Sequence, residues 1–250
     1  MAHKSGRQMS KSERADKLLV SRGFFESRER AQAAIEAGLV TADGAKIGKP
    51  SQQIAQDAEI SAQAVHPYVS RGALKLEAAL NHFKIDPRGK VCLDVGASTG
   101  GFTEILLARG AAKVYAVDTG TDQLHTRLRS DPRVVSFEQT DIRKLEEAAM
   151  PDEAALIVID VSFISLELVL PQALAFAAPH AELVALIKPQ FEAGREHVKK
   201  GIVRDPAVHD AVCQRVELLV GRHGWRLRGT IPSPITGGDG NAEFLLYAEH

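Results

Sequence analysis

Five short apolar runs in the second part of the chain each end on a charged side chain. They are VCLD, VYAVD, VVSFEQTD, LIVID and LVALIK, which end at Asp94, Asp118, Asp141, Asp160 and Lys188. Runs of this length and composition predict buried parallel strands, and ligands bind beyond the carboxyl ends of such strands. Helical patterns separate the runs. The sequence therefore predicts a doubly wound α/β sheet with a ligand site along one edge.

The N-terminal part follows a different pattern. ADKLLVSRGFFES predicts a short helix, and SRERAQAAIEAG predicts a second one with Ser27 as its N-cap and Gly38 just past its end. Asp43-Gly44, within LVTADGAKIG, is a hairpin turn signal. The expected order is helix, helix and a small β-hairpin.

A joint between two domains is expected near His66-Pro67, where no periodicity is visible and proline disfavours helix at the residue before it. The chain is accordingly divided into a flexible basic N-terminus at 1–11, a small α+β domain at 12–62, a short linker at 63–69 and an α/β domain at 70–250.

Composition narrows the class of protein. The 250 residues are 44% hydrophobic and carry a net charge of −1, so a basic surface for nucleic acid must be local. Residues 1–30 hold eight Lys or Arg against four Asp or Glu, a net charge of +4. A solvated helix face is the alternative explanation for this charge.

A soluble protein of a reducing, cytoplasmic compartment is expected. The N-terminus has no apolar segment typical of a secretory signal, and prolines and polar residues interrupt the apolar window 168–187. Cys92 and Cys213 are far apart and have no metal or redox spacing, so buried free thiols are predicted.

The N-terminal domain carries three elements of a known module in order: R-x-D-K-x-L, S-R-x-x-A and G-x-V…G…K-P. The stretch resembles the α-L RNA-binding motif shared by a small-subunit ribosomal protein, tRNA synthetases and pseudouridine synthases. VTADG departs from the usual V-x-V-N-G. The resemblance implies RNA binding, and contacts of this kind with phosphates position a protein rather than read sequence. The expected contacts are Arg14, Lys17, Arg22, Arg28 and Arg30.

A glycine-rich turn, DVGASTGGF, follows the first predicted strand of the α/β domain. Ser98 stands where the dinucleotide pattern G-x-G-x-x-G needs its second glycine, so a ligand without a pyrophosphate is favoured. Asp118 lies 22 positions after Gly96, where an acid can accept both ribose hydroxyls of a nucleoside, and Asp141 is placed near an adenine amine. Asp94 either contacts the ligand or only supports the turn through backbone N–H groups.

LDVGASTGGF, AVD and TDI together resemble the S-adenosylmethionine site of Rossmann-like methyltransferases. The resemblance implies this cofactor and no metal. The implied cofactor-binding residues are Asp94, Gly96, Ala97, Ser98, Thr99, Gly100, Gly101, Phe102, Asp118, Asp141 and Asp160.

Further charged residues occur where the apolar pattern does not explain them. Lys75 and Arg71 lie one turn apart on a predicted helix, a like-charge pair that an external anion such as an RNA phosphate would relieve. A solvated helix face is again the alternative. Lys188 ends an apolar strand directly before Pro189, and Glu243 begins the predicted last, antiparallel strand.

Lys75, Asp160, Lys188 and Glu243 match the Lys-Asp-Lys-Glu tetrad of FtsJ-like ribose 2′-O-methyltransferases in order and context. YVSRGALKLE, IDVSFISL, LIKPQFE and KKGIVRD further resemble the TlyA family of ribosomal RNA methyltransferases, although K-G-G is expected in the last string. The resemblance implies a mostly parallel seven-stranded Rossmann-like sheet with its last strand antiparallel. It also implies methylation of cytidine 2′-hydroxyls, with ribosomal RNA or ribosomal subunits as partners.

Lys188 is the expected central catalytic group. Beside Lys75 and a cationic methyl donor its neutral form is favoured, and it would act as a base; alternatively, protonated Lys188 only steers the 2′-oxygen. Asp160 and Glu243 would orient the lysines. Basic residues outside the N-terminal module are expected to hold RNA backbone, the alternative being a mobile solvated loop: Arg71, Arg195, Lys199, Lys200 and Arg204.

Three other functions fit the sequence less well. A non-catalytic ribosome-assembly factor should have lost tetrad residues or the glycine turn, and neither is lost. A membrane-active hemolysin is not favoured, since no lytic amphipathic helix is evident. A base methyltransferase would need N-P-P-Y or a cysteine at the fourth strand, which ends in DVSF. The particular nucleotide, the subunit and the oligomeric state stay open.

Overall fold

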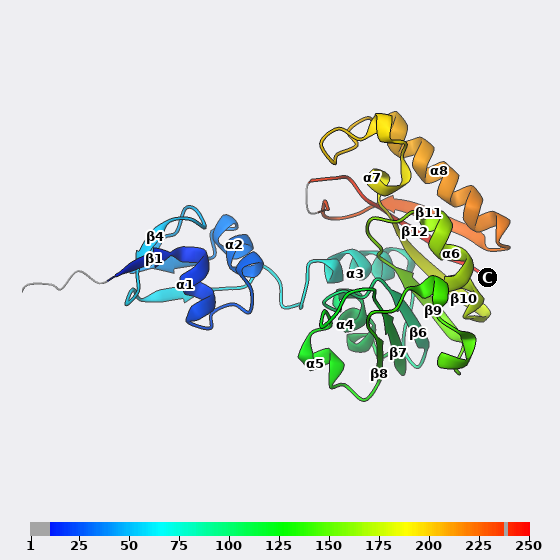
Figure 1. Cartoon of the computed structure of the whole chain (residues 1–250), viewed down its shortest axis with the longest axis horizontal. Helices are drawn as coiled ribbons and strands as arrows, with labels where there is room; N and C mark the ends of the chain where they lie inside the picture. Colours follow the sequence, from blue (N-terminus) through cyan, green and yellow to red (C-terminus); the bar gives the residue numbers. More distant parts are fainter. Residues whose placement is uncertain (1–10, 238–239) are drawn as a thin grey trace, which may run out of the picture. The chain divides into compact units, whose positions relative to one another are not determined.

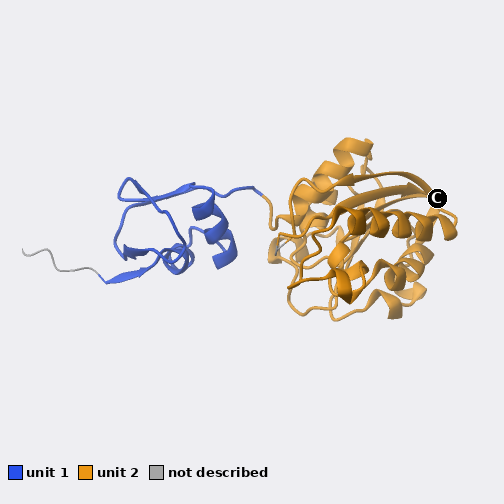
Figure 2. Cartoon of the chain, turned by 90° about the horizontal axis from the view of Figure 1, so that it is seen from above, with its two compact units in different colours: residues 1–67 blue, residues 68–250 orange. Residues whose placement is uncertain are grey.

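The chain divides between Pro67 and Tyr68 into two units, which Figure 2 colours separately. The computed structural model describes residues 11–237 and 240–250, so nearly all of the predicted flexible N-terminus lies outside the described residues. The division falls within the predicted linker. Tyr68 and Val69 are bound to the second unit, because the Tyr68 hydroxyl donates to Glu77 and the Val69 N–H donates to Glu104.

Two helices and five very short strands form the described part of the first unit (Figure 1). β1 pairs with β4, and β2 lies between β3 and β5, all antiparallel. The elements are β1 (Ser12–Arg14), α1 (Ala15–Ser21), α2 (Arg28–Glu36), β2 (Val40–Ala42), β3 (Ala45–Lys46), β4 (Gln53–Ala55) and β5 (Ile60–Ala62).

Both predicted helices and the hairpin are present. The Ser27 side chain caps α2 by accepting the Arg30 N–H at 3.3 Å, and Gly38 follows the helix with a φ of +73°. Asp43 and Gly44 both have positive φ, the signature of a tight two-residue hairpin turn between β2 and β3. β1, β4 and β5 were not predicted, because three residues are too few to show a period.

The second unit is built on one seven-stranded sheet with strand order β11-β12-β10-β9-β6-β7-β8. β12 pairs antiparallel with both neighbours, and the other pairings are parallel, which confirms the predicted architecture. The strands are β6 (Val91–Val95), β7 (Lys113–Val117), β8 (Val134–Phe137), β9 (Ala154–Ile159), β10 (Ala177–Ile187), β11 (Arg226–Pro232) and β12 (Phe244–Glu249).

Helices cover both faces of this sheet (Figure 1). α3 and α4 pack on one face, and α6 and α8 on the other. The helices are α3 (Gly72–Phe83), α4 (Gly101–Ala108), α5 (Thr126–Arg129), α6 (Leu166–Ala175), α7 (Pro189–Glu192) and α8 (Pro206–Arg222), with short 3-10 turns η1 (Ile142–Lys144), η2 (Glu147–Ala149) and η3 (Arg195–His197).

One predicted strand end is wrong. β8 ends at Phe137, and Asp141 lies four residues later, where its carboxylate accepts the Arg143 N–H at the start of η1. Gln139 adopts a φ of +53° between them, so the chain turns before it reaches Asp141. The charged residue that directly follows the strand is Glu138. Its carboxylate accepts backbone N–H groups from the 122–124 segment.

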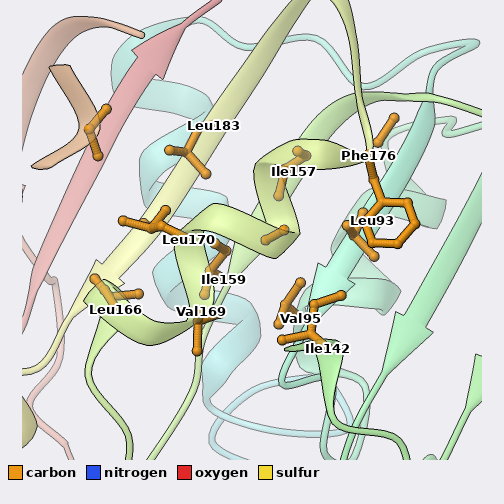
Figure 3. Packing of buried hydrophobic residues seen from close by; sticks show 14 of the residues in the cluster. Leu93, Val95, Ile142, Ile157, Ile159, Leu166, Val169, Leu170, Phe176 and Leu183 are labelled. Carbon is orange, nitrogen blue, oxygen red and sulfur yellow. The ribbon is translucent and has the colours of Figure 1, made fainter. Parts of the chain in front are cut away.

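Alternation along the strands divides the apolar core in two. Odd-numbered residues such as Leu93, Ile157 and Ile159 pack under α6, as Figure 3 shows. Even-numbered neighbours such as Cys92 and Val158 pack under α3 and α4. This strict alternation decides which side of the sheet each strand-end residue faces. None of the described helices is both long and apolar enough to cross a bilayer.

The α6 packing can be tested with two leucines of the same helix. Leu170 is fully buried, whereas Leu168 is 55% exposed. Leu170→Ala should lower the free energy of unfolding of the second unit by about 2–5 kcal/mol, because it leaves a cavity. Leu168→Ala should change it by less than about 0.5 kcal/mol.

Denaturant unfolding followed by the fluorescence of Trp225 measures both changes, since this residue is the chain's single tryptophan and lies buried in the same cluster. Equal effects of the two substitutions would show that α6 is not packed as described.

Candidate active site

The sheet brings the predicted charged residues to one edge and one face. Asp160 directly follows β9, and Lys188 directly follows β10. Asp94 is the penultimate residue of β6 rather than the residue after it. The residues two positions earlier, Cys92, Val158 and Leu186, all belong to the part of the core that packs under α3 and α4. Since side chains two residues apart on a strand project to the same face, Asp94, Asp160 and Lys188 also face α3 and α4.

Glu243 reaches the same place because β12 runs in the opposite direction. Ile187 is paired with Phe244, so the next step of the antiparallel register places Lys188 opposite Glu243. Residues opposite each other in an antiparallel pair project to the same face of the sheet. The predicted tetrad is completed from this face by Lys75, on the buried side of α3.

Two ion pairs join the four residues. Lys188 Nζ lies 2.5 Å from Asp160 Oδ1, and Lys75 Nζ lies 2.6 Å from Glu243 Oε2. The side chains are at most 18% exposed. Burying an ammonium group without a counter-charge costs several kcal/mol, so each lysine needs its carboxylate. Lys188 Nζ also donates a 2.9 Å hydrogen bond to Ser162 Oγ.

The expected external anion beside Lys75 is therefore replaced by an internal one. Glu243 neutralises Lys75, while Arg71, one turn earlier, donates to the Thr236 carbonyl at 3.3 Å and stays exposed. The two cations do not form an uncompensated pair. The sequence alone did not reveal this, because Glu243 is remote from Lys75 along the chain.

The glycine turn packs closely against the end of β9 and the start of α3. Gly96 has a φ of +85°, and a Cβ there would lie 2.4 Å from the Asp160 carbonyl oxygen. A Cβ on Gly101 would lie 2.2 Å from Ser70 Oγ and 2.9 Å from the Ala73 nitrogen. Any side chain at either position would push the turn away from its neighbours.

Asp94 is fully buried beneath this turn. One carboxylate oxygen accepts the Thr103 hydroxyl at 2.6 Å, which ties β6 to the first turn of α4. The other oxygen has no hydrogen-bond partner among the described residues. Burial raises the pKa of Asp94 to about 7, against the opposing effect of the Thr103 hydrogen bond.

Asp118 and Asp141 are both engaged within the protein. The Asp118 carboxylate accepts the N–H groups of Ser98 at 2.8 Å and Gly120 at 2.7 Å, which leaves some of its lone pairs free. Asp141 forms a bidentate pair with Arg143, which lowers the pKa of its carboxyl group. Asp141 therefore reaches the cavity from η1 rather than from a strand end.

A cavity of about 430 Å³ lies at the carboxyl ends of these strands. Its volume is within the usual range of small-molecule sites, about 300–1,000 Å³. Of the residues predicted to bind the cofactor, five line it: Gly96, Ser98, Asp118, Asp141 and Asp160. The other predicted residues of the glycine turn do not line the cavity: Ala97, Thr99, Gly100, Gly101 and Phe102. Ala97 is buried, and Phe102 packs in the core under α3.

Ser162 and Phe163 are among the residues of the cavity wall that the sequence did not predict. Ser162 binds Lys188, and Phe163 is 91% exposed, has a φ of +63° and lies with its ring centroid 5.0 Å from that of Phe191. Both belong to the string IDVSFISL, but a serine and a phenylalanine after a strand have no spacing that indicates a site.

In the first unit, most of the predicted RNA contacts are also bound to other residues. Arg14 and Arg28 both pair with Asp16, which is fully buried and also accepts from Gln32. These partners lower the pKa of Asp16. The guanidinium groups of Arg14 and Arg28 are held in place with their outer parts exposed.

The other three predicted RNA contacts in the first unit are not bound to Asp16. Arg22 donates to the Ala58 carbonyl at 2.6 Å, and Arg30 binds Glu26 and the His66 carbonyl. Lys17 is exposed. The charge of +4 counted over residues 1–30 is thus partly neutralised locally, and Asp16 was not singled out in the sequence.

The basic loop after α7 is exposed and closed by a tight turn. Lys199 and Ile202 form a bridge around Lys200 and Gly201, both at positive φ. Lys200 stands where the family pattern led us to expect glycine, and it adopts a φ of +52°. Arg195, Lys199, Lys200 and Arg204 are exposed and form no ion pair with any described residue.

Comparison with known proteins agrees with this geometry. Residues 68–250 match the FtsJ-like methyltransferase family, and residues 13–60 match the S4 domain. The chain is 43% identical to the 16S/23S rRNA (cytidine-2′-O)-methyltransferase TlyA of Mycobacterium tuberculosis, over 96% of this chain and 90% of that protein. The chain belongs to the TlyA family of FtsJ-like methyltransferases.

Other TlyA-family relatives have different descriptions. The chain is 49% identical to YqxC of Bacillus subtilis, a candidate rRNA methyltransferase, over 95% of this chain and 86% of YqxC. It is 40% identical to Hemolysin A of Brachyspira hyodysenteriae, over 94% and 98% of the two chains. The structure of a hemolysin candidate from Streptococcus thermophilus superposes with a TM-score of 0.77 at 43% identity, covering 97% and 89%.

The raised pKa of Asp94 gives a prediction for the stability of this TlyA-family enzyme. Between about pH 4 and pH 7 the buried carboxyl stays protonated in the folded chain but ionises in the unfolded one. The unfolded state is then favoured as pH rises through this range. Asp94→Asn should remove this contribution, so the variant should gain stability relative to wild type up to about pH 7 and no further above it.

Urea unfolding at half-unit pH intervals from 5 to 8, followed by Trp225 fluorescence, measures the difference. Asp86→Asn is the control, because this exposed residue pairs with Arg88, which lowers its pKa, and it is ionised across the whole range. A constant difference between Asp94→Asn and wild type at all pH values would contradict the assignment.

Proposed function

We propose that this chain methylates the 2′-hydroxyl of a cytidine ribose in ribosomal RNA, with S-adenosylmethionine as the methyl donor. The observation that carries the proposal is the pair of buried lysine–carboxylate ion pairs beside the cavity, at the carboxyl ends of β9 and β10. The relatives named as rRNA (cytidine-2′-O)-methyltransferases support the choice of acceptor.

The cavity fits the cofactor in two respects. Asp118 retains free lone pairs for ribose hydroxyls, and Gly96 allows a ligand to approach the backbone closely. Asp94 does not line the cavity, and its unpartnered oxygen is fully buried beneath the glycine turn. S-adenosylmethionine supplies the activated methyl group when it is bound.

The tetrad residues act on the RNA ribose. In this proposal Lys188 holds the 2′-oxygen in line and, as a neutral amine, accepts its proton; as an ammonium it holds the oxygen by donation. Asp160 orients Lys188, and Glu243 orients Lys75 and balances its charge. Alignment of the two reacting atoms is the main contribution expected from these residues.

The S4-type unit and the basic loop supply the RNA contacts in this proposal. Arg14 and Arg28, held by Asp16, present donors for phosphate oxygens together with Lys17, Arg22 and Arg30. Arg71 and the loop cations Arg195, Lys199, Lys200 and Arg204 would bind backbone near the cavity. Phe163 offers an exposed ring on which an unstacked base can lie.

The other functions considered fit less well. An assembly factor without activity has no need of two buried lysines, whose desolvation must be offset by two carboxylates. A base methyltransferase with a cysteine nucleophile is not supported, since neither Cys92 nor Cys213 lines the cavity and burial raises the pKa of each thiol to about 12.

A ribosomal substrate would also place the enzyme in the cytoplasm.

Lys188→Ala should lower methyl transfer at least about 100-fold, because it removes the group that holds or deprotonates the 2′-oxygen. The purified full-length chain is incubated with methyl-labelled S-adenosylmethionine and unmodified ribosomal subunits. The RNA is then digested, and nucleosides are identified by mass spectrometry. Wild type should give labelled 2′-O-methylcytidine, and binding of subunits by the variant should survive.

Lys113→Ala is the matched control. Lys113 is also paired with an aspartate, but it lies at the opposite end of the sheet, at the start of β7. The control should transfer methyl at nearly the wild-type rate. Wild-type transfer by Lys188→Ala would remove Lys188 from the mechanism, and label in another nucleoside would overturn the proposed acceptor.

Arg28→Gln tests the RNA surface of the first unit. It should weaken binding of ribosomal subunits and lower the slope of log affinity against log salt by about 1, the effect of one lost phosphate contact. Asp16 keeps Arg14 and Gln32 as partners, so the fold should survive.

Arg88→Gln serves as the control for Arg28→Gln, since Arg88 is likewise paired with an aspartate, Asp86, but lies in the second unit. Its binding and salt slope should equal those of wild type. Unchanged affinity of Arg28→Gln across the salt series would exclude Arg28 from the RNA contacts.

A further inference from the structure

Lys188 Nζ has two partners in the structure. It donates to Ser162 Oγ at 2.9 Å, and it forms an ion pair with Asp160 Oδ1, 2.5 Å away, that lacks the geometry of a hydrogen bond. No third partner of Nζ is present among the residues that the structure describes. The nitrogen therefore keeps hydrogen-bonding capacity for a group outside the chain.

Ser162 is well placed to hold the nitrogen in this orientation. It lies two residues after Asp160 on the segment between β9 and α6, its side chain is exposed, and it forms part of the cavity wall. Its hydroxyl is thus at the boundary between buried Lys188 and the space that a ligand would occupy.

The segment that carries Ser162 is fixed at its other end. The buried carboxylate of Glu192 accepts the Ser165 hydroxyl and the Leu166 N–H, both at 2.7 Å. Glu192 itself ends α7, which begins directly after Lys188. The two segments are therefore joined at both ends, once through Lys188 and once through Glu192, which restricts the movement of Ser162 relative to Lys188.

We propose that Ser162 is a positioning residue, which by its hydrogen bond, together with the ion pair to Asp160, orients Lys188 Nζ toward the ribose 2′-oxygen. The inference rests on the proposed function, because it assumes that Lys188 acts on that oxygen.

The arrangement serves both forms of the lysine. In the ammonium form, an N–H that is not used by Ser162 donates to the 2′-oxygen. In the neutral form, one N–H still donates to Ser162, and the lone pair is directed at the 2′-hydroxyl. As the 2′-oxygen forms its bond to the methyl carbon, the carbon–sulfur bond of the sulfonium donor would break and leave its electron pair on sulfur, which becomes a neutral thioether. The 2′-O–H bond would break at the same oxygen, and its proton would pass to the lysine lone pair, which gives the ammonium.

Ser162→Ala should lower kcat about 10- to 100-fold, the loss expected for one hydrogen bond to a charged group, with the KM values for cofactor and ribosomal subunit within about threefold of wild type. Ser162→Thr should restore kcat, because it retains the hydroxyl and its methyl group is accommodated at an exposed position. Ser136→Ala, at an exposed serine of β8, should have no effect. A Ser162→Ala enzyme with wild-type kcat would overturn the proposal while leaving the proposed function intact.

A second measurement does not depend on activity. Trace acetylation with acetic anhydride, read by mass spectrometry, gives the reactivity of Lys188 relative to Lys113 in the same chain. Ser162→Ala should raise this ratio about fivefold, because the amine loses one of its two partners. An unchanged ratio would overturn the Ser162 assignment. A wild-type enzyme that makes no 2′-O-methylcytidine would instead overturn the proposed function, and the acetylation ratio would still decide whether Ser162 holds Lys188.

Discussion

The burial of two lysine ammonium groups at one edge of the sheet is the constraint on which the second unit depends. Lys188 can be buried because Asp160 ends the neighbouring parallel strand, and Lys75 can be buried because Glu243 faces α3. Removing one member of such a pair leaves an uncompensated charge, which costs about 3–5 kcal/mol. Because β12 runs antiparallel to β10, its first residues, and Glu243 just before them, lie at the edge where the parallel strands end.

The sequence predicted this edge well where strand ends coincide with the change from apolar to charged residues. Asp118, Asp160 and Lys188 each directly follow a strand, since a strand buried on both faces stays apolar until it leaves the sheet. The prediction that Asp141 ends a strand is wrong, because the strand has only four residues and the chain turns at Gln139. The residue types in VVSFEQTD do not show whether the strand ends at Phe137 or continues to Asp141.

Contacts between residues far apart in the sequence were the least predictable. The neighbouring cations Lys75 and Arg71 predicted an external anion beside Lys75. The anion that Lys75 pairs with is Glu243, which directly precedes the last strand. In the first unit, five cations were read as a phosphate surface, yet Asp16 holds two of them. A charge count includes Asp16 as one more anion and does not show that it is fully buried between guanidinium groups.

The cavity and the basic loop are held by different contacts. At the cavity, Asp118 binds the glycine turn, Thr103 binds Asp94, and Glu192 fixes the segment after β9. At the basic loop, buried Asn241, two residues before Glu243, accepts from the Val203 N–H and donates to the Gly201 carbonyl, and His209 Nε2 lies 2.9 Å from the Val203 carbonyl oxygen. A small cofactor of fixed shape needs preformed walls. Exposed cations that bind an RNA backbone adjust to it, so a loop that carries such cations needs fewer fixed contacts than the wall of a small-molecule site.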